Sequence, residues 1–289
     1  MKMNNVKTVG LLALMSVLLV VVVQALGGSA VVALGFAAVF NIGAYFFSDK
    51  LAIAASHAKP VEEHQLPQVY AIVRRLGMQA EMPMPRIYLI DSPQPNAFAT
   101  GRNPKHAAVA VTSGILQIMS NEELEAVLAH EISHVRNRDI LISSIAAMMA
   151  AALSMIARFA FFFGGGGRDR NNPMGAVGAL AALIVGPIAA MFIRFAISRA
   201  REYQADASGA AITGQPLHLA SALRKIGQAT ERIPMQVNPA VSQLYIADPL
   251  KAFGNRRGGA GQLSRLFSTH PPIEDRIRRL EEMAGRGPV

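Results

Sequence analysis

Four long apolar runs constrain most strongly what this 289-residue chain can fold into. Two of them lie near the N-terminus, at residues 9–26 and 31–47, with only a short glycine-containing turn between them. Each approaches the roughly 20 residues that a helix needs to cross a bilayer. Because the second run follows the first directly, we interpret the pair as a helical hairpin, and a cleaved signal peptide becomes the weaker interpretation.

The other two runs cover residues 140–163 and 175–193, and they are joined by a polar, glycine-rich loop. Their lengths favour crossing the membrane, although packing over a catalytic domain is the alternative. Arg158 interrupts the third run near its far end, where its long side chain could reach the interface. The sequence therefore predicts an integral membrane protein with up to four transmembrane helices.

The charges fix an expected orientation for this arrangement. Lysines precede the first run and follow the second at Lys50, and the turn between the runs has none. Positively charged flanks stay in the cytoplasm, so the N-terminus and the segment after Lys50 are expected there. Arg168 and Arg170, in the loop between the third and fourth runs, would then lie outside, which is a mild violation of the rule.

Composition supports a membrane protein and excludes other classes. Hydrophobic residues make up 52% of the chain and charged residues 16%, whereas soluble domains carry about a quarter charged residues. The net charge of +9 comes from basic residues that flank apolar segments, so we expect no nucleic-acid partner. The chain has no cysteine, which excludes disulfides and thiolate metal ligands.

A short motif at residues 130–134 carries the predicted chemistry. Ser120 and Glu123 form the pattern of a capping box, so a helix is expected to begin there. On that helix His130 and His134 are four residues apart and share one face, where two imidazoles can bind one zinc ion. Glu131 then lies beside the remaining coordination position. The alternative is an amphipathic helix with two ordinary histidines.

A catalytic zinc of this kind needs a third protein ligand and an open position. Glu202 and Asp206 are four residues apart on a predicted helix that begins where the fourth apolar run ends. Predicted strands at residues 86–90, 96–101 and 106–112 precede the histidine helix. A predicted small sheet among mainly helical segments makes the fold class α+β.

Four motifs in order resemble the HtpX family of membrane-embedded zinc metalloproteases, which are related to the CAAX prenyl proteases. They are the histidine motif, Arg-Glu-Tyr-Gln-Ala-Asp at residues 201–206, Asn-Ala-Phe-Ala-Thr-Gly at 96–101 and Thr-His-Pro-Pro at 269–272. The resemblance covers nearly the whole chain. It implies a zincin-like catalytic domain, with His130, His134 and Glu202 as zinc ligands and Glu131 as the general base.

The resemblance also implies further roles. Asp206 would orient a ligand histidine, or it is a solvated carboxylate on a helix face. His270 is a candidate oxyanion donor, or simply a residue at the start of a helix, and Arg276 could share either role. A strand edge would hold an extended substrate through main-chain hydrogen bonds, and it comprises Asn96, Ala97, Phe98, Ala99 and Thr100. Asn96 could bind substrate directly or serve as a turn residue.

The remaining histidines have no partners at metal-ligand spacing, so we interpret them as ordinary surface or core residues: His57, His64, His106 and His218. The chain divides into a hairpin (1–50), a zincin-like subdomain (51–139), a second apolar pair (140–197) and a C-terminal subdomain with the third ligand (198–289).

We therefore expect a zinc endopeptidase with one Zn²⁺ per chain in the inner membrane, its site facing the cytoplasm. Its partners would be the lipid bilayer and unfolded or misfolded membrane proteins, with a role in quality control. The alternatives are a catalytically silent zinc-stabilised scaffold or chaperone, a prenyl-peptide protease, and a transporter with a metal site. The oligomeric state is not predicted.

Overall fold

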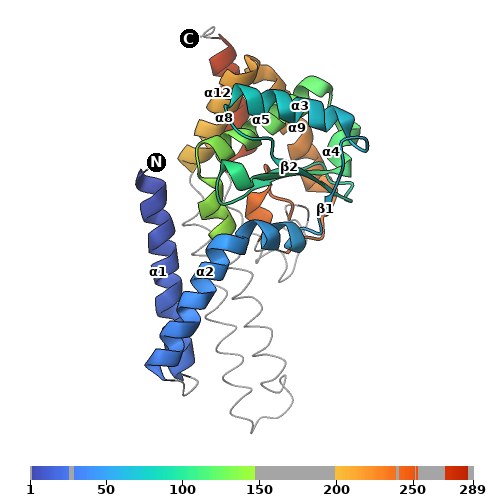
Figure 1. The fold of residues 1–289 in the computed structure, drawn as a ribbon. Helices are drawn as coiled ribbons and strands as arrows, with labels where there is room; N and C mark the ends of the chain where they lie inside the picture. The colour runs from blue at the N-terminus through green and yellow to red at the C-terminus, as the bar shows by residue number, and fades with distance from the viewer. Residues whose placement is uncertain are drawn as a thin grey trace, which may run out of the picture.

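The computed structural model describes residues 2–25, 29–146, 199–238, 241–250, 252 and 271–285. Within these residues the protein is mainly helical and contains one small mixed sheet, as expected (Figure 1). The fourth apolar run and most of the third lie outside the described residues, and so does His270. The number of membrane spans therefore stays a prediction.

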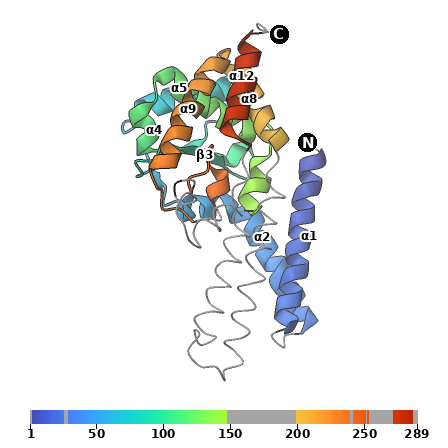
Figure 2. The ribbon, with the colours of Figure 1, turned by 180° about the vertical axis from the view of Figure 1, so that it is seen from behind.

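The first two apolar runs form two packed helices, α1 (Lys2–Ala25) and α2 (Ala30–Ala55). Ser29 caps α2 by accepting a hydrogen bond from the Val32 N–H at 3.3 Å. The hairpin extends away from the rest of the described chain in both views (Figures 1 and 2). Among the described residues, α2 is the one helix that is long and apolar enough to cross a membrane. It ends five residues beyond Lys50, later than the sequence suggested.

A polar contact joins the two helices of the hairpin. The Asn41 side chain donates hydrogen bonds to Ser16 Oγ at 2.6 Å and to the Leu12 carbonyl at 3.3 Å. An amide bridging two apolar helices fixes their relative rotation, because no other partner for it is available in an apolar surrounding. The hairpin is therefore held by a specific contact as well as by packing.

The sheet has the strand order β1-β2-β4-β3, with β2 and β4 parallel and the other two pairs antiparallel. The strands expected at 86–90, 96–101 and 106–112 are confirmed, with slightly shorter bounds for the last two, and the short β1 was not predicted. Since β3 is the last strand in this order, one of its sides has no strand partner. The strands are β1 (Lys59–Pro60), β2 (Arg86–Ile90), β3 (Ala97–Thr100) and β4 (Ala108–Thr112).

Helix α5 (Asn121–Arg136) lies at the centre of the described body and contacts β3 and three other helices. Its apolar side chains, among them Leu124, Leu128 and Ile132, are fully buried in the main core. Burying each such side chain stabilises the fold by about 1.5–3 kcal/mol. The other helices are α3 (Pro67–Gln79), α4 (Ser113–Ile118), α8 (Arg199–Thr213), α9 (Pro216–Arg232) and α12 (Ile273–Gly285).

The start of α5 is fixed by the capping box that the sequence predicted. Ser120 Oγ accepts from the Glu123 N–H, and the Glu123 carboxylate accepts from the Ser120 N–H at 2.9 Å. Glu123 also accepts from Ser221 and Lys225 of α9, at 2.7 and 2.6 Å. The cap thus joins α5 to α9 as well as starting the helix, and α5 becomes a fixed platform for its histidines.

Candidate metal centre

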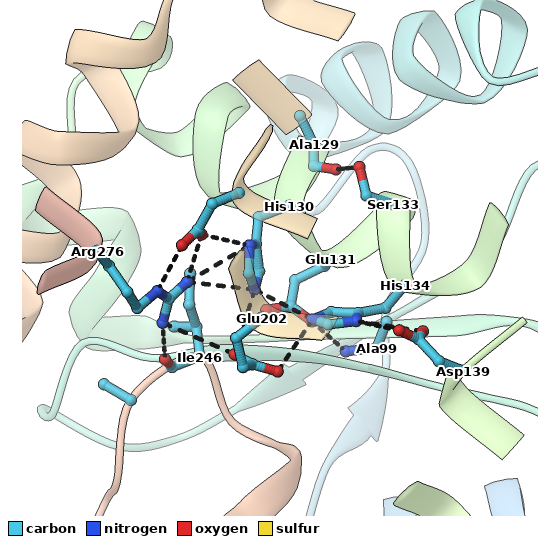
Figure 3. Close-up of polar contacts among 12 residues, drawn as sticks. Ala99, Ala129, His130, Glu131, Ser133, His134, Asp139, Glu202, Ile246 and Arg276 are labelled. Atoms are coloured by element: carbon cyan, nitrogen blue, oxygen red, sulfur yellow. Dashed lines mark hydrogen bonds and ion pairs between the residues drawn. The ribbon is translucent and has the colours of Figure 1, made fainter. Parts of the chain in front are cut away.

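His130 and His134 lie on consecutive turns of α5 and point to the same side, and Glu131 is the residue next to His130 (Figure 3). His130 and Glu131 are buried, at 1% and 2% exposure, and His134 is half-buried. The two Nε2 atoms are 3.2 Å apart. Two imidazole nitrogens facing each other this closely form half of a metal site, because each carries a lone pair when deprotonated.

Helix α8 brings Glu202 to the same point. Its carboxylate oxygens lie 3.5 Å from His134 Nε2 and 3.9 Å from His130 Nε2. One ligand atom from each of the three residues falls within 4.8 Å of the others. A tetrahedral zinc ion with bonds of 2.0–2.1 Å separates its ligands by about 3.3 Å. The two-histidine, one-carboxylate set therefore fits a zinc ion after small side-chain movements.

Gly209 permits the close approach of α8 to α5. A Cβ atom at this position would lie 2.9 Å from the His130 backbone nitrogen and 3.1 Å from the Ala129 carbonyl carbon. Gly209 lies seven residues after Glu202 and three after Asp206, so all three face α5. The missing side chain thus sets how near the two acidic residues come to the histidines.

Each histidine is oriented by a carboxylate behind its Nδ1 atom. Asp206 lies 2.9 Å from His130 Nδ1, which is the arrangement expected from the sequence. Asp139 lies 3.1 Å from His134 Nδ1, and this partner was not predicted. The backbone at Arg138 has φ of 56°, which turns the chain back so that Asp139 faces α5. Such carboxylate partners fix the ring and leave Nε2 free for a metal.

Arg276 of α12 is fully buried and connects the centre to two other segments. Its guanidinium donates to both oxygens of Asp206, at 2.9 and 2.7 Å, and to the Ile246 carbonyl at 2.9 Å (Figure 3). It also lies 3.9 Å from Glu202. A bidentate contact of this kind holds a carboxylate in one plane. Arg276 therefore positions Asp206, and through it His130, whereas the sequence suggested a role shared with His270.

The pKa values of the centre follow from burial and these partners. Burial opposes ionisation of Asp206, but Arg276 and His130 outweigh it and lower the pKa of Asp206 to about 2. Burial also lowers the pKa of His130. An anionic Asp206 beside a neutral His130 leaves Nε2 of that histidine ready to bind a cation.

Glu131 and His134 shift in the opposite direction. Burial raises the pKa of Glu131 to about 8, and the nearby Glu202 adds to the shift. Burial opposes charge on His134, but Asp139 and the other carboxylates raise its pKa to about 10. Glu131 also accepts a hydrogen bond from the Ala99 N–H at 2.8 Å. A carboxylate whose pKa is raised this far binds a proton more strongly, and the positive charge of a bound cation would lower its pKa again.

A small cavity of about 30 Å³ opens beside these groups. Helix α5 forms one side of it, and the residues from 243 to 246 form another. Ala99, Ile140 and Ser143 complete the lining. The three potential metal ligands and Glu131 all reach this cavity, so a cation and a substrate carbonyl could meet there.

The five residues proposed to bind substrate are all buried. Ala97, Phe98, Ala99 and Thr100 form the last strand of the sheet, and Asn96 precedes it. The open strand edge expected from the sequence is not free at Ala97, because its carbonyl accepts a hydrogen bond from the Ile246 N–H at 2.9 Å. The other described histidines lie outside the cluster, with His57, His64 and His106 exposed and His218 half-buried.

Comparison with protein families matches residues 63–284 to Peptidase family M48. This region contains the two histidines, Glu131 and the third potential ligand. The chain therefore belongs to peptidase family M48, and the protein is a metalloprotease, a hydrolase of peptide bonds.

Three relatives narrow the comparison, and each is called Protease HtpX homolog. The proteins of Pelotomaculum thermopropionicum and Thermodesulfovibrio yellowstonii are 47% and 48% identical, over 98% of this chain and 100% of theirs. That of Burkholderia thailandensis is 49% identical over 98% of both. The crystal structure of S. mikatae Ste24p matches with 18% identity and a TM-score of 0.48, over 93% of this chain and 62% of that one. The chain is thus similar over its whole length to HtpX proteases.

Proposed function

We propose that the protein is a membrane-bound zinc endopeptidase of the two-histidine, one-glutamate type. In this proposal His130, His134 and Glu202 hold one zinc ion, and Glu131 is the general base. The observation that carries it is the convergence of these four side chains on one cavity, with their imidazole and carboxylate partners already in place.

The chemistry divides between the ion and the chain. A bound zinc ion would supply Lewis acidity, which activates water near neutral pH and polarises a peptide carbonyl. Glu131 takes the proton of the attacking water and returns it to the leaving amine nitrogen. The Ala99 N–H, 2.8 Å from the Glu131 carboxylate, holds that side chain toward the cavity. Asp206 and Asp139 keep the two imidazoles in place throughout. His270 is proposed as an oxyanion donor.

The membrane location is proposed from the hairpin. Large apolar side chains on α2 are exposed, among them Val31, Phe36 and Val39, and lipid is the surrounding that covers such a surface at low free energy. The charge pattern supports several spans in the inner membrane and a site on the cytoplasmic side. Partners of this enzyme are the bilayer and unfolded or misfolded membrane proteins, and its role is their quality control.

The decisive test compares wild type with Glu131→Gln, both zinc-loaded in detergent, for cleavage of an unfolded polypeptide. Loss of a general base lowers the rate by about 10²–10⁴-fold while the ligands remain. Glu122→Gln, on the exposed face of the same helix, is the matched control and should cleave like wild type. Metal analysis should find one zinc per chain in all three.

Two outcomes would contradict the proposal. Cleavage by none of the three proteins, each with zinc bound, would leave a silent zinc-stabilised membrane protein. Equal cleavage by wild type and Glu131→Gln would place the active site elsewhere in the chain.

A further inference from the structure

Residues 244–247, here called the tethered segment, contact β3 beside the metal centre, and at Ala97 they make a main-chain hydrogen bond of the kind that a bound peptide would make. We infer that this segment occupies the groove in which a substrate strand must lie, and that cleavage requires it to leave. The inference rests on the proposed protease function, and it adds how the groove binds a main chain and what keeps it closed.

The first contact is on the free side of β3. The Asn96 carbonyl points toward β4, where it accepts from the Thr112 N–H, so the main-chain groups of the next residue, Ala97, point to the opposite side. The Ala97 carbonyl accepts from the Ile246 N–H at 2.9 Å. Peptides that bind by adding a strand use main-chain hydrogen bonds of this type. The tethered segment thus already makes the contact that a substrate strand would make.

Asn96 and Arg276 hold the same stretch of main chain. The Asn96 side chain donates to the Ala247 carbonyl at 2.9 Å, and its oxygen lies 3.4 Å from the Ala247 nitrogen. Arg276 donates to the Ile246 carbonyl at 2.9 Å (Figure 3). All the polar main-chain groups of two consecutive residues are therefore bound by the groove. None of these contacts uses a side chain of the tethered segment itself, so the main chain of another peptide could make them all.

The side chains of the tethered segment show which substrates the groove suits. Tyr245 is fully buried and packs edge-to-face on Phe98 of β3, with ring centroids 4.9 Å apart. Leu244 and Ile246 are also buried. An aromatic residue flanked by branched apolar residues fills the groove, which is the composition of an apolar stretch from an unfolded membrane protein. We therefore assign extended, apolar peptide segments as the substrate class.

The position of the tethered segment makes it a block as well as a template. Residues 243–246 line the cavity that also contains the two histidines, Glu131 and Glu202. A substrate strand and the tethered segment cannot both lie beside Ala97 and donate a hydrogen bond to its carbonyl. When only a fraction of molecules has an open groove, the apparent affinity for substrate falls by that fraction. The enzyme described here is therefore in a latent conformation.

The first test weakens the tethered segment and measures cleavage of an unfolded apolar polypeptide. Tyr245→Ala removes the ring that packs on Phe98, and Ile246→Pro removes the N–H that donates to Ala97. We expect kcat/KM to rise by about tenfold in each, mostly through KM, because the open fraction increases. Tyr70→Ala is the matched control, since Tyr70 is a partly buried tyrosine of α3 whose hydroxyl donates a hydrogen bond to the Val61 carbonyl. It should show no rise.

A fall in kcat/KM with zinc retained would overturn the inference and make the segment a permanent wall of the active site. Absence of cleavage by wild type as well would instead overturn the proposed function, together with the inference that rests on it. The two failures are thus distinguishable from the same set of assays.

The second test leaves the segment intact, so it decides the matter even if a variant loses its zinc or its fold. In Glu131→Gln, which binds substrate without cleaving it, hydrogen exchange at the amides of Ile246 and Ala247 is measured with and without saturating polypeptide. Displacement predicts at least tenfold faster exchange when substrate is bound, as these amides lose their acceptors. Unchanged protection at saturation would overturn the inference. A synthetic peptide of residues 241–250 should also inhibit wild type competitively, whereas the same peptide with Leu244→Ser, Tyr245→Ser and Ile246→Ser should inhibit much less.

Discussion

The hairpin and the catalytic body of this protein place their residues in opposite ways. On α2, Val31 is 79% exposed and Val39 is 72% exposed, although both are strongly apolar. In the body, Arg276 has no exposure and Glu131 has 2%, although both carry or can carry charge. Each arrangement costs free energy in water unless its surroundings compensate it.

The difference teaches that the two regions depend on different surroundings. The hairpin is stabilised by what lies outside it, since its exposed apolar surface calls for lipid. The body is stabilised from inside, because each buried charge is compensated by a specific partner, as Asp206 is by Arg276. Changes in the body should therefore act through lost partners, whereas changes in the hairpin should act through the membrane.

The largest effect is expected from breaking the buried pair in the body. Arg276→Leu leaves Asp206 buried without its cation, which should destabilise the fold by about 3–5 kcal/mol and release zinc. Arg278→Leu, whose side chain is 64% exposed, should change stability by at most about 0.5 kcal/mol. Denaturant unfolding in detergent and metal analysis measure both. A stable, zinc-loaded Arg276→Leu protein would show that the pair contributes little.

The corresponding change in the hairpin introduces a charge on its apolar surface. Val39→Lys should cost about 2.5–3.5 kcal/mol if this position lies in the bilayer, and it should reduce the membrane-inserted fraction. Leu217→Lys on α9, 51% exposed in the body, should leave insertion and folding unchanged. Resistance to carbonate extraction measures insertion. Equal insertion of both variants would mean that α2 does not face lipid at this point.

Two glycines sharpen the comparison at a smaller scale. Gly209→Ala forces α8 away from α5, which should cost about 1–3 kcal/mol and weaken zinc binding. Gly43→Ala in α2 meets no atom within 4 Å, and the better helix propensity should favour it by up to about 1 kcal/mol. Zinc titration and thermal unfolding test the pair. Tight zinc binding by Gly209→Ala would show that the helices can separate without moving Glu202.

A pH dependence is expected in the body and not in the hairpin. Without metal, His134 has a pKa of about 10 and is protonated at neutral pH, so its proton must leave when zinc binds. Zinc affinity should then rise by about tenfold per pH unit between pH 6 and 8. Calorimetry in buffers of different ionisation enthalpy counts the released protons. Asp139→Asn removes the carboxylate that raises this pKa, so it should flatten the dependence; an unchanged slope would exclude His134 as its source.

Local signals in the sequence were sufficient for much of the fold. The capping box at Ser120 and the strand pattern at residues 86–90 predicted elements that the structure contains. The spacing of His130 and His134 predicted that both would point to one side of α5. In each case the interacting groups are separated by a few residues, so their geometry follows from the helix or strand alone.

Contacts between distant segments could not be predicted in this way. Arg276 meets Asp206 across 70 residues, and Ile246 meets Ala97 across 149, from a stretch that reads as a loop with several prolines. Asp139 is near His134 in sequence, but it is brought back by a left-handed turn at Arg138. Such a turn usually has a glycine, and without one it could not be predicted. Which loop residues approach a strand depends on how the helices pack, and that information is not local.

The turn at Arg138 also limits how far the metal centre can lie from the membrane. Ile140, where the next helix and the third apolar run begin, is the sixth residue after the metal-facing His134. Fully extended, six residues reach about 20 Å, and Asp139 is already bound back to His134. If the third run enters the bilayer, this short connection keeps the metal centre within about 20 Å of the start of that run. In that case a polypeptide projecting far from the membrane could be cut only near its membrane end.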